Sequence, residues 1–596
     1  MNDAARADSL RLAQPADAHS QAEWEAATAA VLRKSGRLTS EDADSLVWDK
    51  LTRTSLDGLR IAPLGLPDTS FADTVFADTV RPTRAGAWDI RSLVSGLPGV
   101  DAKAANEAAL VDLDGGVSSL WVAADETTDL HVLLDKVLLD LAPVVLDAPI
   151  GAVKVAQNLL ALIAERGTGL HAATNLGADP MGALVRDLPL APDEAFAELV
   201  DLARLAQGIG VRAIVVDATA AHDLGASDVQ ELGWSIAVGV AYLRALTEAG
   251  FSPAVAAAQI EFRYAATDEQ FPTIAKLRAA RQLWSRVLEL SGADGVEMRI
   301  HAVSSRPMLS KYDPYVNMLR GTVAAFAAGV GGADAVTVLP FDSANGVPDG
   351  FGRRIARNVS HLLIDESHVA AVADPAGGSY AVERLTADMA AAGWDAFVQL
   401  EDEWEQGRDF SPFRDRIAAV SAAREKAIAR RKRPITGLTE FPNLAETLPE
   451  RPVDPLNERV ARYGASFEAL RDNPATARVF LATLGTVAQH TARATFATNL
   501  FAAGGIGVEV AGATADAEEL AASYRAAGAP PVVCLAGSDK TYGAWGAAAI
   551  AALREAGATH VIIAGKPDAV DAEVDDAASM GVDALAFLTA TREKLA

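Results

Sequence analysis

The feature that most constrains the fold is a regular alternation of short apolar runs with longer amphipathic segments, between residues 120 and 374. Short apolar runs between helices are typical of parallel strands that are buried on both faces. Eight such runs centre on Leu120–Ala123, Val144–Ala148, His171–Asn175, Ala213–Asp217, Ile260–Tyr264, Val296–His301, Ala335–Phe341 and Val369–Asp374. The helical patterns between them include Leu130–Leu141, Ala195–Gln207, Val229–Glu248, Pro272–Leu288 and Gly352–Asp365. Eight strand–helix units in about 260 residues match a closed (β/α)8 TIM barrel.

The same alternation returns in the last part of the chain, from residue 477 to residue 596. The predicted strands are Val479–Leu484, Gly507–Ala511, Val532–Ala536, Val561–Ala564 and Ala584–Leu588. The predicted helices between them are Asp516–Ala527, Gly543–Ala556 and Asp568–Met580. Five parallel strands in this length predict a flavodoxin-like, doubly wound domain, whose ligands bind beyond the carboxyl ends of the strands. The fold class is therefore α/β, with a barrel followed by a doubly wound domain.

Changes in composition divide the chain further. Prolines gather between residues 404 and 475, which indicates a linker. Ahead of the barrel, an amphipathic pattern at Trp24–Leu32 and an extended run at Leu59–Leu64 predict an arm. We therefore expect an N-terminal arm at 1–85, a barrel at 86–403, a linker at 404–475 and a C-terminal domain at 476–596.

Composition excludes several classes of protein. The formal net charge of −26 lacks the basic face that a nucleic-acid partner requires. No window approaches the ~18 consecutive apolar residues of a membrane span, and the N-terminus has no apolar run suited to a secretion signal. With Cys534 as the only cysteine, an internal disulfide is impossible. These features together predict a cytoplasmic protein. The nine histidines form no His-x-His or His-Glu-x-x-His pattern, so we predict no metal site.

Three motifs in the second half of the barrel resemble those of the methylmalonyl-CoA mutase family. In chain order they are Asp313-Pro314-Tyr315-x-Asn317-x-x-Arg320, Arg354-Ile355-Ala356-Arg357-Asn358 and Asp374-Pro375-Ala376-Gly377-Gly378-Ser379-Tyr380. Three blocks in this order and spacing are hard to produce by chance. The resemblance covers nearly the whole chain and is weakest at the N-terminus and in the linker. It implies a barrel followed by a cobalamin-binding type of flavodoxin-like domain.

The resemblance also implies where adenosylcobalamin would sit. In catalytic relatives a histidine in an Asp-x-His-x-x-Gly loop holds the cobalt, and the aspartate orients the imidazole. The matching segment reads Ala488-Gln489-His490-Thr491-Ala492-Arg493, so His490 is either a weak ligand or a helix-start histidine without one. Ser538 falls where the family has a hydroxyl residue near the cofactor tail. Lys566 stands at the second position of a Gly-Gly pair that gives the tail room.

The catalytic positions of the barrel are also replaced. Catalytic relatives carry a Tyr-His pair after the fourth strand, and here the matching residues are Thr219 and Ala220. A further tyrosine, which follows an Ile-Arg dipeptide in those relatives, is Leu93. His222 lies two residues beyond Ala220 and is expected to face elsewhere. Because these side chains cannot hold a substrate carbonyl or a radical in place, we predict no catalytic residue in this chain.

Some enzymes of this family have two subunits, and the replaced residues suit the subunit that does not carry out the reaction. The resemblance implies the small (β) subunit of a heterodimeric methylmalonyl-CoA mutase, an isomerase of propionate metabolism. Its large (α) subunit would bind adenosylcobalamin and interconvert (R)-methylmalonyl-CoA and succinyl-CoA, while this chain binds no cofactor and supports the complex. Two alternatives remain open: a self-sufficient mutase that uses His490, and an acyl-CoA-binding or sensing protein without catalysis.

Overall fold

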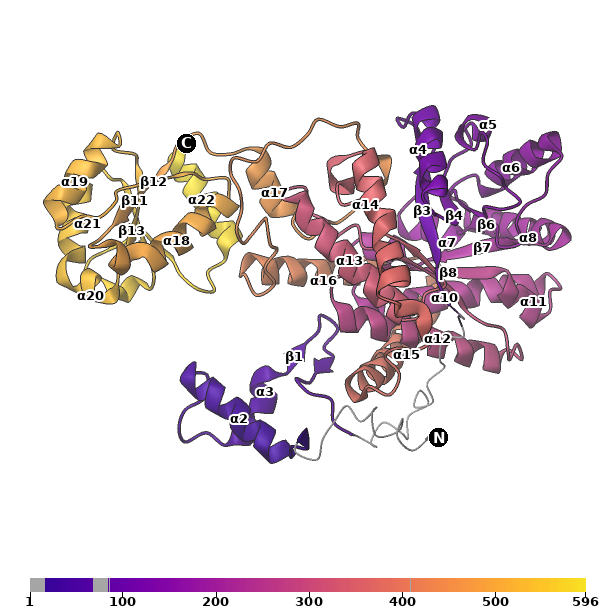
Figure 1. The fold of residues 1–596 in the computed structure, drawn as a ribbon, viewed down its shortest axis with the longest axis horizontal. Helices are drawn as coiled ribbons and strands as arrows, with labels where there is room; N and C mark the ends of the chain where they lie inside the picture. Colours follow the sequence, from indigo (N-terminus) through magenta and orange to yellow (C-terminus); the bar gives the residue numbers. More distant parts are fainter. Residues whose placement is uncertain (1–16, 68–83, 85, 408) are drawn as a thin grey trace, which may run out of the picture.

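The computed structural model describes residues 17–67, 84, 86–407 and 409–596. Figure 1 shows three parts: an arm that contains α2 and α3, a barrel surrounded by helices, and a C-terminal sheet at the opposite end of the molecule. Helices α16 (Ser411–Ala429) and α17 (Ala465–Asp472) lie between the barrel and the C-terminal sheet.

The barrel is closed and all of its strand pairs are parallel. Its order is β10-β3-β4-β5-β6-β7-β8-β9, so each strand pairs with the next along the chain and β10 closes on β3. The strands are β3 (Asp89–Ser95), β4 (Ser119–Ala123), β5 (Val144–Asp147), β6 (Asn175–Ala178), β7 (Arg212–Asp217), β8 (Ile260–Ala266), β9 (Arg299–Ser304) and β10 (Ala335–Thr337). The predicted TIM barrel is therefore confirmed.

Helices surround the barrel and bury their apolar stripes against it. They are α4 (Ala102–Asp114), α5 (Leu130–Leu133), α6 (Ala152–Arg166), α7 (Pro180–Val185), α8 (Pro192–Ile209), α9 (Thr219–Asp223), α10 (Asp228–Glu248), α11 (Pro253–Ala258), α12 (Gln270–Leu290), α13 (Pro314–Val330), α14 (Gly350–His361) and α15 (Tyr380–Gly407). Helix α15 packs on α10 and α12. This contact needs a glycine, because a Cβ on Gly233 would lie only 2.6 Å from the Cβ of Ala396.

The membership of the barrel differs from the prediction at both ends. Residues Val369–Ala371 form a 3-10 turn and not an eighth strand, although the segment is apolar. The strand that completes the barrel is β3, which pairs with both β4 and β10. Its buried Arg91 interrupts any apolar run, because the side chain enters a polar barrel interior. A third strand was predicted at His171–Asn175, whereas β6 begins at Asn175.

The C-terminal sheet has the strand order β12-β11-β13-β14-β15, with all neighbours parallel. Its strands are β11 (Val479–Thr483), β12 (Val508–Val510), β13 (Val532–Ala536), β14 (His560–Ala564) and β15 (Asp576–Ala578). Its helices are α18 (Val487–Ala503), α19 (Ala517–Ala526), α20 (Asp539–Thr541), α21 (Ala547–Glu555) and α22 (Ala584–Leu595). This is the predicted doubly wound arrangement.

The last strand of this sheet was predicted wrongly. Residues Ala584–Leu588, predicted as a strand, begin helix α22, which is capped by Asp583. The predicted helix at Asp568–Met580 instead contains β15, the edge strand. An edge strand faces water along one side and tolerates the acidic sequence Asp575-Asp576, so its apolar signal is weak.

The remaining segments connect these two domains and form the arm. Helix α15 crosses residue 403, where we predicted the barrel to end and the linker to begin. Helices α16 and α17 lie within the predicted linker, 404–475. The arm contains α2 (Gln21–Lys34), α3 (Val47–Leu51) and the antiparallel pair β1 (Arg53–Thr54) and β2 (Arg60–Ile61). The arm has a small apolar cluster of its own, which contains Ala29, Leu32, Leu38 and Val47. No helix of the described residues is long and apolar enough to cross a membrane.

Candidate functional site

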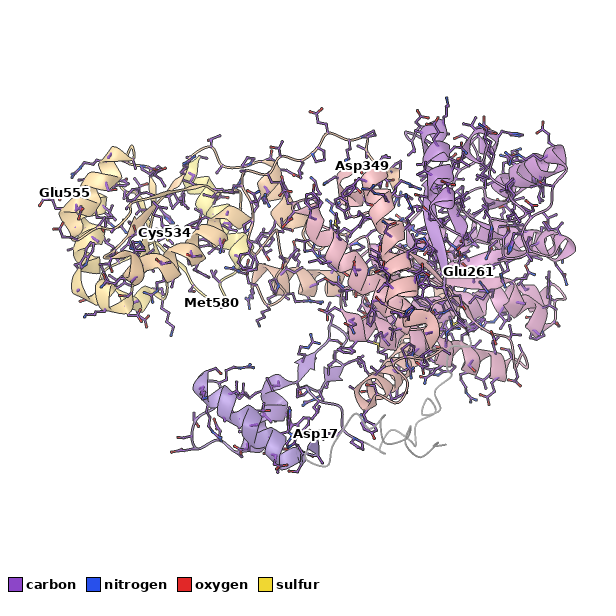
Figure 2. All side chains as sticks on the ribbon, viewed as in Figure 1. Asp17, Glu261, Asp349, Cys534, Glu555 and Met580 are labelled. Carbon is purple, nitrogen blue, oxygen red and sulfur yellow. The ribbon has the colours of Figure 1, made fainter. Side chains whose placement is uncertain are left out.

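Charged side chains meet across the inside of the barrel. Arg91 of β3 forms an ion pair with Glu261 of β8, although the two strands are not neighbours in the barrel. Its second guanidinium nitrogen lies 3.1 Å from Asp89. Both Arg91 and Glu261 are buried, and Figure 2 shows Glu261 within the barrel. A contact between non-neighbouring strands crosses the barrel axis, so this pair occupies the interior.

A second layer of side chains fills the interior nearer the carboxyl ends of the strands. Arg263 of β8 lies 4.1 Å from the ring centroid of Trp121 on β4, which is the strand opposite in the barrel order. The same guanidinium lies 2.9 Å from Asp147, and the Trp121 indole donates to that carboxylate at 2.8 Å. His301 meets the indole edge-on, with 5.6 Å between the ring centroids. Trp121, Arg263 and His301 are each at most 1% exposed, so the axis is packed with side chains.

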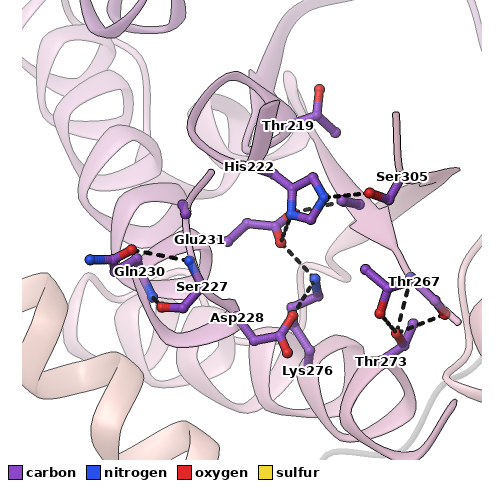
Figure 3. A network of polar contacts seen from close by, with 12 residues as sticks. Thr219, His222, Ser227, Asp228, Gln230, Glu231, Thr267, Thr273, Lys276 and Ser305 are labelled. Carbon is purple, nitrogen blue, oxygen red and sulfur yellow. Dashed lines mark hydrogen bonds and ion pairs between the residues drawn. The ribbon is translucent and has the colours of Figure 1, made fainter. Parts of the chain in front are cut away.

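Figure 3 shows a third polar network, where β7, β8 and β9 end. His222 of α9 lies 2.7 Å from the Ser305 hydroxyl through Nε2, and its Nδ1 lies 3.6 Å from Glu231. Lys276 of α12 bridges Glu231, at 2.6 Å, and Asp228, at 2.8 Å. The carboxylates of Glu231 and Asp228 and the ammonium group of Lys276 therefore form one network with the His222 imidazole.

The protonation of this network follows from its burial. Desolvation, strengthened by the nearby charge of Lys276, lowers the pKa of His222 well below its usual value, so the imidazole is neutral. Burial raises the pKa of Glu231 to about 7 despite its contact with Lys276. Lys276 lowers the pKa of Asp228 against the opposing effect of burial, and we take Asp228–Lys276 as the permanent ion pair.

A cavity of about 700 Å³ lies beside this network. His222 and Asp228 line it from the barrel, together with Thr267 after β8 and Met308 after β9. Other walls come from the β1–β2 hairpin, from α13, from α16 and from the segment after α16. Parts of the arm, the barrel and the linker thus enclose one space at the carboxyl ends of the strands, where barrel proteins place their ligand sites.

The predicted barrel positions take structural roles. Thr219 begins α9 and donates its hydroxyl to Asp217, and Ala220 is fully buried beside it. Leu93 pairs in register with Trp121. Only His222, which we expected to face elsewhere, lines the 700 Å³ cavity. From its spacing we expected His222 to face away from the Tyr-His positions, but the spacing did not predict what its ring contacts.

The two candidate residues of the C-terminal domain lie on different helices. His490 is the fourth residue of α18 and is buried, and its Nδ1 has no hydrogen-bond partner among the described residues. Ser538 is the N-cap of α20: its hydroxyl oxygen accepts from the Thr541 amide at 3.2 Å and lies 2.8 Å from the Thr541 hydroxyl. The structure thus gives Ser538 a capping role.

Arg493 occupies the carboxyl ends of β13 and β14. It donates to the carbonyl of Gly537 at 2.6 Å and forms an ion pair with Asp539. Its guanidinium lies over the ring of Tyr542, 4.7 Å from the centroid, and packs against Gly565. The Tyr542 hydroxyl in turn lies 3.0 Å from the carbonyl oxygens of both Leu535 and Ala564. These two side chains fill the space between the strand ends.

Comparison with known proteins identifies the family. The sequence profile of the methylmalonyl-CoA mutase family matches residues 95–526. The chain is 44% identical to the methylmalonyl-CoA mutase small subunit of Streptomyces virginiae, over 99% of this chain and 98% of the relative. It belongs to the methylmalonyl-CoA mutase family. It is also 35% identical to the small subunit of Propionibacterium freudenreichii subsp. shermanii, over 92% of this chain and 90% of the relative.

A full-length relationship to small subunits groups this chain with the small subunits of the mutase family. The methylmalonyl-CoA mutase of Escherichia coli (strain K12) is 28% identical over a shorter part, 55% of this chain and 47% of that protein. Family membership makes the chain an isomerase subunit. The mutase motifs did not reveal the buried residues Glu231, Lys276 and Ser305. A detectable signal was present for one of them, since Lys276 lies between Ala275 and Leu277 in a long helical pattern.

Proposed function

We propose that this chain is the non-catalytic small subunit of an adenosylcobalamin-dependent methylmalonyl-CoA mutase. Its large subunit would interconvert (R)-methylmalonyl-CoA and succinyl-CoA, and this chain would stabilise that subunit by packing on it. The observation that carries the proposal is the closed interior of the barrel. Trp121 and Arg263, from opposite strands, are in contact across the axis where a substrate would otherwise lie.

The C-terminal domain gives separate support, because its residues do not fit a cobalamin. Arg493 and Tyr542 fill the strand ends that would have to receive the cofactor tail. His490 lies within the first turns of α18, with Ala488 where an orienting carboxylate would be needed. Without that carboxylate nothing fixes the ring orientation. We therefore assign no step of the reaction to this domain and place the cofactor in the partner.

The test is reconstitution from separately purified subunits. Turnover of methylmalonyl-CoA with excess adenosylcobalamin is measured for this chain, for the large subunit and for their mixture. We expect no activity from this chain and the highest and most durable activity from the mixture. Turnover by this chain alone would contradict the proposal, and a His490→Ala variant would then show whether that histidine carries the activity.

Equilibrium dialysis distinguishes the remaining alternative, an acyl-CoA-binding protein. If the barrel interior is closed, methylmalonyl-CoA and succinyl-CoA bind the mixture but not this chain alone. A sensing protein would bind the esters by itself and gain thermal stability from them by mass action.

The arm is proposed as part of the contact with the large subunit. It has its own small apolar cluster and joins the barrel through the β1–β2 hairpin, and Val31 on α2 is 64% exposed. Deleting residues 1–60 should weaken the complex without unfolding the barrel. The measurement is co-purification with the large subunit, and unchanged recovery of the complex would remove the arm from the interface.

A further inference from the structure

The 700 Å³ cavity beside His222 is lined by more cationic groups than the carboxylates around it neutralise. Arg320 and Arg424 line the cavity and are 8% and 6% exposed. Lys432 lines it from the segment after α16. Among the described residues, no carboxylate lies within ion-pair distance of these three side chains. A buried guanidinium without a counter-charge is costly, so a cavity lined by such groups favours an anion.

The two arginines are held in place by neutral groups. Arg424 donates to the carbonyl oxygens of Gly225, at 2.9 Å, and Ala226, at 3.2 Å, and its guanidinium lies 4.7 Å from the ring centroid of Tyr463. Arg320 donates to Asn317 at 2.6 Å and to the carbonyl of Thr436 at 2.9 Å. These bonds fix both guanidinium groups, and neither has an ion-pair partner among the described residues. Burial lowers the pKa of Arg320, and the more distant carboxylates Asp268, Asp313 and Glu468 oppose that shift only in part.

The carboxylates of the cavity are already engaged or have a raised pKa. Asp228 is paired with Lys276, and Glu269 with Arg433 at 2.9 Å. Asp57, at the tip of the β1–β2 hairpin, accepts from the Ser227 hydroxyl, and burial raises its pKa to about 6. Burial also raises the pKa of Asp268. Asp57 and Asp268 are therefore the two lining carboxylates without an ion-pair partner among the described residues, against the three cations Arg320, Arg424 and Lys432.

A further feature favours an anion. The 21-residue helices α10 and α12 begin at the cavity, with their N-caps Ser227 and Glu269 in its wall, and helix N-termini attract negative charge. His222 also lines the cavity, with its Nε2 at Ser305 and its Nδ1 3.6 Å from Glu231. The neutral imidazole is therefore a polar part of the wall that adds no charge.

We propose that this cavity binds a small organic anion, a carboxylate or a phosphate ester. Its charge is balanced by Arg320, Arg424 and Lys432, and its apolar part lies against Met308 and Tyr463. The volume is that of a small-molecule site. The cavity lies outside the filled barrel axis, so the inference does not depend on the proposed role in the mutase. A failure of either one leaves the other standing.

Titration calorimetry on the full-length chain tests the site with four probes: inorganic phosphate, pyrophosphate, succinate and citrate. We expect at least one to bind with Kd below about 1 mM. Binding of phosphates alone identifies a phosphate ester, and binding of carboxylates alone identifies an organic acid. No binding of any probe up to about 10 mM would overturn the proposal.

Matched variants locate the binding. Arg424→Gln should weaken the best probe by about tenfold or more, since it removes a charge-assisted hydrogen bond to the anion. Lys432→Gln should weaken it by a few-fold, and because Lys432 is exposed this variant folds normally. Lys154→Gln, an exposed lysine on α6 far from the cavity lining, should change nothing. Equal affinity of the Lys432→Gln and Lys154→Gln variants, together with unchanged binding by Arg424→Gln, would place the ion elsewhere and refute the site.

Discussion

The barrel interior and the C-terminal sheet are both closed, but by opposite chemistry. Ion pairs cross the barrel, with Arg91 on Glu261 and Arg263 on Asp147. The C-terminal sheet is instead packed by aliphatic side chains such as Leu481 and Ile562, with the buried Cys534 among them. An apolar interior gains free energy in proportion to the area buried. A buried ion pair holds only while both partners are present. The two regions should therefore fail in different ways.

The largest effect is expected in the barrel. Arg91→Met leaves Glu261 buried without its cation and should lower the free energy of unfolding by about 3–5 kcal/mol. The double variant Arg91→Met/Glu261→Leu should recover most of this loss, because the buried Glu261 charge is then removed as well. Asp89, the second partner of Arg91, is 21% exposed and keeps its hydrogen bonds from the hydroxyls of Ser118 and Ser119. Both are measured by chemical denaturation followed by tryptophan fluorescence. If the double variant is no more stable than the single one, the cost is one of packing and the comparison with the C-terminal sheet fails.

In the C-terminal sheet, Leu535→Ala should cost about 3 kcal/mol, through lost burial and the cavity that remains. Leu535 is fully buried in β13 and makes no charged contact. Unlike in the barrel, no second substitution that removes a charge should therefore restore the lost stability. The same denaturation experiment measures the effect. Ile563→Val, which removes one methylene group from the neighbouring strand, is the matched control and should cost about 1 kcal/mol.

The ionic character of the barrel also predicts a pH dependence. Burial raises the pKa of Asp179, which follows β6, to about 7. A carboxyl whose pKa is higher in the folded state than in the unfolded state stabilises the fold at low pH. That contribution is lost as the pH rises towards 7, at about 1.4 kcal/mol per unit. We expect about 2 kcal/mol to be lost between pH 5 and pH 7.

Asp179→Asn keeps a hydrogen-bond acceptor for the Tyr242 hydroxyl, which lies 2.6 Å from Asp179 in the native chain. It should remove the share of Asp179 in the decrease of Tm over this pH range, while the comparable share of Glu231, whose pKa is also raised to about 7, remains. A variant with the same slope as the native protein would assign the pH dependence to other carboxyls, such as Glu231.

The smallest effect concerns Ser538 and sharpens the view of the C-terminal domain. Because Ser538 caps α20, Ser538→Ala should cost about 1 kcal/mol of stability. Ser538→Asp, which also caps helices well, should restore it. Neither change should alter the activity of the reconstituted enzyme with adenosylcobalamin. A loss of activity at native stability would instead make Ser538 a cofactor residue.

Several parts of this outcome were predictable from local sequence. Apolar runs such as Ile260–Tyr264 and Val532–Ala536 identified most strands, because buried parallel strands need apolar side chains on both faces. Apolar runs do not mark strands that face polar surroundings. Two strands were therefore not predicted: β3, whose Arg91 enters the ionic interior, and the acidic edge strand β15. The strand predicted at Val369–Asp374 is wrong, because its apolar residues Val369–Ala371 form a turn.

For the candidate site, the sequence predicted only which catalytic side chains of the family are missing. Motif positions predict that Leu93, Thr219 and Ala220 replace the family's catalytic residues. They could not show that His222 meets Glu231 and Ser305, or that Glu231 meets Lys276, because these residues come from four different elements or loops. Contacts of this kind depend on how the barrel closes.

The sequence by itself determined the family and the order of the barrel and the C-terminal sheet, since both follow from residue identity and local periodicity. It also predicts the replacement of the catalytic side chains. Tertiary structure alone decided that Trp121 and Arg263 meet across the axis. It also decided that Arg320, Arg424 and His222 surround one cavity. The physical reason is that burial and the pairing of charges are properties of neighbours in space, and the closed barrel brings together residues that no local pattern connects.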